Sequence, residues 1–136
     1  MGKKIILFLL IFSVSMGALG CAKDSAPGVV VQAEITYEHQ GETLYRCYTQ
    51  PEKLSGFLML MRLQRFCGYA KVNPEKIAGD RCRIVLTRID GTKAIILQNA
   101  GRFRCRDYRR WEKIDGVQGE RLHAYLRDVP GDVSGT

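Results

Sequence analysis

The chain has 136 residues, of which 46% are hydrophobic and 26% charged, and 21 Lys and Arg against 14 Asp and Glu give a formal net charge of +7. This length allows one domain with a modest core and argues against two. The apolar and aromatic fractions exclude a disordered chain, and the sequence shows neither a collagen-like repeat nor heptads.

The first residues have the composition of an export signal. Lys3 and Lys4 precede an uninterrupted apolar run over 5–12, and small residues follow. This order is typical of a secretory signal peptide. Residues 18–21, Ala-Leu-Gly-Cys, resemble the lipobox of bacterial lipoprotein precursors. The resemblance implies cleavage after residue 20 and a lipid anchor of diacylglycerol and fatty acid, such as palmitate, on Cys21.

Two other interpretations of the leader stay open. Residues 5–22 carry no charge and are long enough for an uncleaved signal anchor, and Cys21 could stand by chance beside an ordinary cleavage site. All three interpretations place the rest of the chain outside the cytoplasm. We expect a signal peptide over 1–20, then a lipidated cysteine and short tether over 21–27 that reaches about 20 Å.

These expectations place the protein on the extracytoplasmic face of the cell membrane. Ala22, which follows the lipidated cysteine, resembles an outer-membrane sorting signal in envelopes that have two membranes.

A β-hairpin and a helix are predicted next. Polar residues alternate with β-branched and aromatic ones over 29–38, a Gln-Gly turn follows, and the pattern resumes over 43–48. Thr49 and Glu52 have the spacing of a capping box, and an apolar stripe then runs to Cys67. Two arginines interrupt this stripe, so we predict a buried amphipathic helix and not a membrane span.

The remaining elements complete the predicted fold. We expect a loop over 68–80 with a helical turn at 73–75, strands over 81–89, 92–98 and 102–106, and a helix over 115–129. The order ββ-α-βββ-α predicts an α+β fold, in which an antiparallel sheet carries two helices on one face. This single domain is expected to cover 28–130, with a tail over 131–136.

Four cysteines remain in the predicted mature chain: Cys47, Cys67, Cys82 and Cys105. Their spacing matches no zinc motif, whereas four thiols in an exported chain favour two disulfides. A predicted helix of about 24 Å separates Cys47 from Cys67, and the predicted strand register separates Cys82 from Cys105. The open alternatives are 47–82 with 67–105, 47–105 with 67–82, or free thiols.

Most catalytic signatures are absent from the sequence. There is no Gly-rich phosphate loop and no GxSxG, HExxH or CxxC motif. We interpret His39, beside the hairpin turn, and His123, beside the apolar face of the last helix, as exposed or core-edge side chains. We therefore expect no catalytic residue, metal or cofactor. The first hypothesis is a non-enzymatic binding or accessory module of the cell envelope, and the alternative is an envelope enzyme inhibitor or a small enzyme.

The sharpest local feature is the segment 102–111, in which three aromatic residues are interleaved with five arginines: Arg102, Arg104, Arg106, Arg109 and Arg110. Strand alternation predicts the first three on one exposed face, with Phe103 and Cys105 toward the core. Such segments are typical of nucleic-acid binders, but export disfavours that partner.

We predict that these arginines bind an anionic membrane surface or an anionic envelope polymer. An envelope protein is a further possible partner. The alternative is a solvated strand face that discourages edge-to-edge pairing and is partly neutralised by Asp107, Glu112 and Asp128.

Overall fold

A computed structural model describes residues 28–132 of the chain. The expected signal peptide, the lipidated Cys21, the tether and the end of the tail lie outside the described residues. The elements are β1 (Val30–His39), β2 (Glu42–Tyr48), α2 (Pro51–Leu63), β3 (Phe66–Tyr69), the 3-10 turn η2 (Pro74–Lys76), β4 (Arg81–Arg88), β5 (Lys93–Asn99), β6 (Phe103–Arg106), β7 (Trp111–Ile114) and α3 (Gly116–Asp128).

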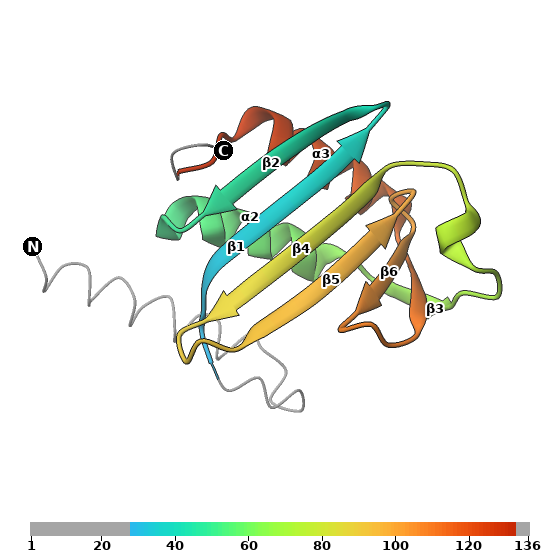
Figure 1. Cartoon of the computed structure of the whole chain (residues 1–136), viewed down its shortest axis with the longest axis horizontal. Coiled ribbons are helices and arrows are strands. Elements are labelled where there is room, and N and C mark those ends of the chain that lie inside the picture. The colour runs from blue at the N-terminus through green and yellow to red at the C-terminus, as the bar shows by residue number, and fades with distance from the viewer. Residues whose placement is uncertain (1–27, 133–136) are drawn as a thin grey trace, which may run out of the picture.

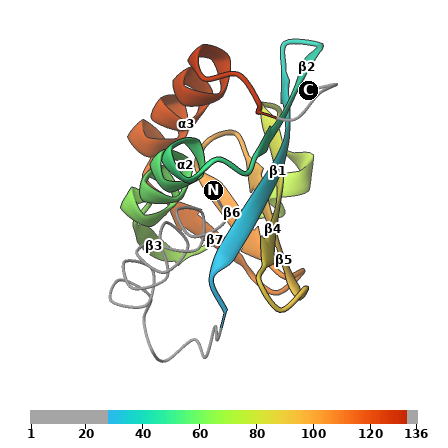
Figure 2. The same cartoon turned by 90° about the vertical axis from the view of Figure 1, so that its left-hand side faces the viewer.

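The domain is a two-layer α+β sandwich, as the sequence predicts. Seven antiparallel strands form one sheet in the order β2-β1-β4-β5-β6-β7-β3. Helices α2 and α3 cover the same face, and of the described helical segments only the short 3-10 turn η2 lies on the other side (Figures 1 and 2). Within the described part of the chain, neither helix has the length and apolar character needed to cross a bilayer.

The apolar core lies between the helices and strands β1, β2 and β4. Alternation in β1 sends Ala33, Ile35 and Tyr37 toward the helices, while the polar residues between them face the uncovered side. The helices meet this surface with apolar residues of α2 and α3: Leu54, Phe57, Leu58, Met61, Leu122 and Leu126. The core therefore occupies the half of the sheet next to the first hairpin.

The start of α2 differs from the predicted capping box. Gln50, and not Thr49, is the N-cap residue, and no side chain of the helix itself caps it. The carboxylate of Asp132, from the other end of the domain, accepts the backbone N–H of Thr49 at 2.7 Å and of Gln50 at 2.5 Å. Burial raises the pKa of Asp132, but these hydrogen bonds outweigh it and hold the pKa below its usual value.

Helix α2 also ends earlier than predicted, at Leu63 and not near Cys67. The backbone of Gln64 is extended, and its buried side chain pairs with the carboxamide of Gln98 on β5. This contact turns the chain toward the sheet, where residues 66–69 become the edge strand β3.

A further strand, β7, is absent from the predicted order. It pairs with β6 after a turn in which Asp107 and Tyr108 both have positive φ angles. Aspartate tolerates a positive φ angle, but tyrosine rarely adopts one, and the turn contains no glycine. Tertiary contacts of Asp107 hold the turn, since its N–H and its carboxylate both bind the backbone of Ile95.

Candidate functional site

The register of β6 reverses the predicted orientation of the arginine-rich segment. Arg104 lies opposite Gln98, which lies opposite Cys82 in the helix-covered core. Directly paired residues share a face of the sheet, so Arg104 and Arg106 point to the helix side. Phe103 and Cys105 point to the other side, and the predicted exposed stripe of arginines is wrong in this respect.

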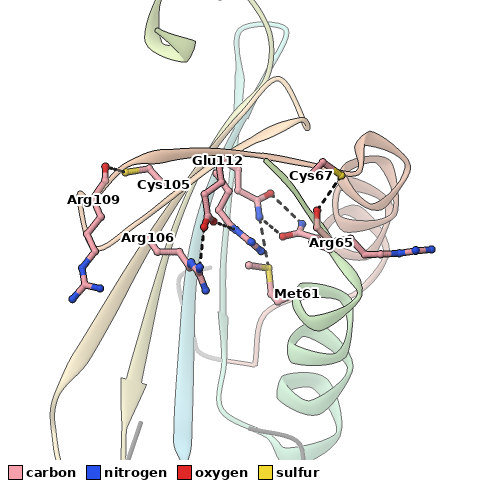
Figure 3. Close-up of polar contacts among 10 residues, drawn as sticks. Met61, Arg65, Cys67, Cys105, Arg106, Arg109 and Glu112 are labelled. Carbon is pink, nitrogen blue, oxygen red and sulfur yellow. Dashed lines mark hydrogen bonds and ion pairs between the residues drawn. The ribbon is translucent and has the colours of Figure 1, made fainter. Parts of the chain in front are cut away.

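Arg104 and Arg106 both bind Glu112 of β7 (Figure 3). The Nε of Arg104 lies 3.0 Å from one carboxylate oxygen, and an Nη of Arg106 lies 2.9 Å from the other. The side chains of Arg104 and Glu112 are 9% and 8% exposed, whereas that of Arg106 is 53% exposed. Arg104 therefore belongs to a buried ion pair, while Arg106 reaches solvent.

Arg106 lines a surface cavity of about 430 Å³ together with three other arginines. We call this site, formed by Tyr69, Arg88, Arg106, Arg109 and Arg110, the arginine pocket. The guanidinium of Arg110 stacks on the Tyr69 ring, 3.9 Å from its centroid, which holds its position by a cation–π contact. Figure 3 shows Arg109 beyond Arg106, farther from helix α2.

Among the described residues, positive charge exceeds negative charge in the lining of the arginine pocket. Four arginines line it against two carboxylates, of which Glu112 is shared with Arg104 and Asp107 also accepts the backbone N–H of Ile95. Within residues 28–132, Arg88, Arg109 and Arg110 form no ion pair with a carboxylate. The pocket is therefore able to receive an anion.

The arginine pocket lies near the point where the chain enters the domain. Gly28 packs so closely on Arg88 that a Cβ atom added to it would lie 3.1 Å from the Arg88 Cβ. The carbonyl of Val29 accepts the N–H of Ile89 at 2.8 Å. The expected tether therefore joins the domain beside one wall of the pocket.

The sequence identified only part of this site. Arg106, Arg109 and Arg110 come together as expected, but Arg104 is buried and Arg102 lines a different cavity. Sequence reasoning missed Arg88 and Tyr69, which reach the pocket from the end of β4 and from β3. No short-range pattern connects these positions to the arginine-rich segment.

The strand order excludes both proposed disulfide pairings. Neighbouring strands are about 4.8 Å apart, so the two strand intervals between Cys67 and Cys105 exceed disulfide reach. The four intervals between Cys47 and Cys105, and between Cys67 and Cys82, exceed it further. Cys47 and Cys82 are separated by β1 and lie on opposite faces of the sheet. The four cysteines of the described region are free thiols, and burial raises the pKa of Cys82.

Comparisons of the chain with protein-family models, curated proteins and solved structures find no match.

Proposed function

We propose that this protein is a membrane-anchored extracytoplasmic lipoprotein, and that its domain is a non-enzymatic module that binds anionic phosphate groups at the membrane surface. The observation that carries this proposal is the arginine pocket, in which Arg88, Arg109 and Arg110 form no ion pair with a carboxylate of the described residues. The lipobox-like leader supports the anchor at Cys21.

The chemistry of the arginine pocket suits phosphate. A guanidinium presents a planar fork of N–H donors that matches two phosphate oxygens, and it stays charged at any physiological pH. Arg110 is held on Tyr69 and Arg106 on Glu112, so part of the pocket is ordered before a ligand arrives. Such preorganisation lowers the entropy lost on binding.

The position of the pocket favours lipid headgroups as the source of the phosphate. A six-residue tether reaches at most about 20 Å, so the end of the domain that it joins stays close to the bilayer. The contact of Gly28 with Arg88 places the pocket at that end. An anionic envelope polymer offers the same phosphate chemistry, and the vesicle-binding experiment distinguishes it from lipid headgroups.

The test compares two double variants in binding to vesicles at low salt. Arg109→Gln with Arg110→Gln removes two pocket charges, and Arg62→Gln with Arg65→Gln removes two exposed charges of α2 and the chain after it. Arg104 and Arg106 are left in place because they bind Glu112. The protein lacking residues 1–21 is added to vesicles of phosphatidylglycerol with phosphatidylcholine, and to phosphatidylcholine alone.

We expect binding to the anionic vesicles that is released near physiological ionic strength. Two arginines at about 1 kcal/mol each predict a loss of roughly 30-fold in the pocket variant. The α2 variant is expected to lose far less. Equal losses in both variants, or equal binding to neutral vesicles, would contradict the proposal, and binding to polyglycerol phosphate but not to vesicles would assign the pocket to a polymer.

A further inference from the structure

A second cluster of polar side chains lies at the opposite end of β1 from the chain entry. His39 is the last residue of β1, Asp80 immediately precedes β4, and His123 projects from α3. The pairing of Glu38 with Arg81 brings the first two side by side across the ladder. One potential ligand atom from each of the three residues lies within 4.8 Å of the other two.

We propose that His39, Asp80 and His123 form a binding site for a divalent transition-metal ion of the zinc class. Two imidazoles and one carboxylate are the ligands that such ions prefer. One carboxylate alone makes a poor site for calcium or magnesium, which take six or more oxygen ligands.

The geometry requires little movement to accept the ion. Nδ1 of His39 lies 2.8 Å from both carboxylate oxygens of Asp80. Zinc bonds of about 2.0–2.2 Å at tetrahedral angles place neighbouring ligand atoms about 3.4 Å apart. The distance from His39 to Asp80 is shorter than this value, and all three ligand atoms lie within 4.8 Å of one another, so side-chain rotations can bring them to the tetrahedral spacing.

Two of the three ligands, Asp80 and His123, are positioned by neighbouring groups. The hydroxyl of Tyr37 donates to Asp80 Oδ2 at 2.8 Å, and the Tyr37 ring stacks on His123 with centroids 4.8 Å apart and planes 3° from parallel. The carbonyl of Asp80 accepts the N–H of Ala100 at 2.7 Å. Outer contacts of this kind orient metal ligands and strengthen binding.

The backbone before Asp80 is fixed by a close approach that only glycine permits. Gly79 has a φ angle of +149°, and a Cβ atom at this position would lie 2.8 Å from the Cβ of Ala100. This packing joins the end of the loop before β4 to the turn after β5, and it sets the direction from which Asp80 meets His39.

A cavity of about 580 Å³ adjoins the three ligands. Three protein ligands leave a coordination position for water or a small anion, which is the arrangement of metal sites that exchange a ligand. Arg102 and Glu120 also line this cavity, so it contains both a cationic and an anionic group near the open position.

Cobalt(II) is a suitable probe because its visible spectrum reports the ligand set of a zinc site. The untagged full-length chain in detergent is titrated with Co²⁺, and then with Zn²⁺ in competition. We expect one ion per chain, a spectrum of nitrogen and oxygen ligation, and no thiolate charge-transfer band. Asp80→Asn, which preserves size and the acceptor for Tyr37, and His39→Gln, at the end of a strand, are each expected to weaken binding by about tenfold or more.

Two control variants separate this site from adventitious ions. Cys67→Ser removes the exposed thiol and Glu42→Gln removes an exposed carboxylate of the first hairpin, and both are expected to bind as the wild type does. Retained affinity in both Asp80→Asn and His39→Gln would overturn the proposal. Loss of binding in Cys67→Ser, or a thiolate band in the wild type, would also overturn it.

Discussion

Glu112 binds the two arginines of β6 that point to the helix side of the sheet. Its carboxylate is buried on the helix side of the sheet, where Arg104 and Arg106 bind its two oxygens. A buried ion pair is weak evidence for stability as a whole, but loss of one partner leaves the other charge without compensation. Glu112 therefore lets β6 carry arginines on a face that is otherwise a core face.

Glu112→Ala is expected to lower the free energy of unfolding by about 3–5 kcal/mol, because Arg104 stays buried without its carboxylate. Chemical denaturation of purified protein measures this change. The double variant Arg104→Met with Glu112→Leu replaces the pair by apolar side chains and is expected to recover most of the loss. If the double variant has as low a free energy of unfolding as Glu112→Ala, the loss of stability has a cause other than the unpaired charge of Arg104.

Helices α2 and α3 pack closely against each other at one glycine. Gly56 of α2 lies against Tyr125 of α3, and a Cβ atom added to the glycine would lie 2.6 Å from the tyrosine hydroxyl oxygen. That hydroxyl donates to the carbonyl of Lys53 at 2.6 Å, and the ring packs edge-on against Tyr48. The tyrosine therefore cannot move aside without losing these contacts.

Gly56→Ala is expected to lower the free energy of unfolding by about 1–3 kcal/mol. Alanine gains about 1 kcal/mol of helix propensity, but overpacking costs about 1–3 kcal/mol and the Tyr125 hydrogen bond about 1 kcal/mol more. Thermal denaturation checks the sign of the net effect. Ser55→Ala, one residue away and exposed, provides the control for propensity alone, and we expect it to be neutral or stabilising.

Coupling between the two positions tests the cause. Tyr125→Phe removes the hydroxyl oxygen that the new methyl group would meet, so Gly56→Ala with Tyr125→Phe is expected to lose less than the sum of the single variants. If the changes in stability of the two single variants simply add, the contact with the Tyr125 hydroxyl is not the cause, and the destabilisation arises elsewhere in α2.

At the scale of the whole molecule, the sequence predicted what local periodicity determines. The first hairpin, the β4–β5 hairpin and both helices follow from alternation, helical stripes and turn residues, and their order gave the α+β class. Strands β3 and β7 escaped prediction because they are short and because tertiary contacts of Gln64 and Asp107 define their boundaries.

The residues of the candidate sites were likewise predicted where they are close in sequence and missed where only the tertiary structure brings them together. Arg106, Arg109 and Arg110 are close in sequence and were found, whereas Arg88 and Tyr69 join them only through the strand order. His39 and His123 were interpreted as exposed or core-edge side chains, because their association with Asp80 depends on the pairing of β1 with β4 and on the packing of α3. The orientation of Arg104 was predicted wrongly because strand alternation does not say which face is covered.

The proposed anchor makes a prediction about how the whole molecule is held at the membrane. Acyl chains contribute about 0.8 kcal/mol for each buried methylene, and this contribution does not depend on salt. The arginine pocket acts through charge, which 1 M salt screens within about 3 Å. A lipid-anchored protein should therefore stay with the membrane in a high-salt wash, whereas the protein lacking residues 1–21 should be released.

Metabolic labelling with a palmitate analogue tests the residue that carries the anchor. We expect the wild type to be labelled and Cys21→Ala to lose the label, since the thiol of Cys21 is the acceptor that the lipobox implies. Cys67→Ala is the matched control, because Cys67 is the exposed cysteine of the described region and its replacement should leave the labelling unchanged. Equal labelling of the wild type and Cys21→Ala would refute the lipoprotein interpretation, and unlabelled wild type that still resists the salt wash would favour an uncleaved signal anchor.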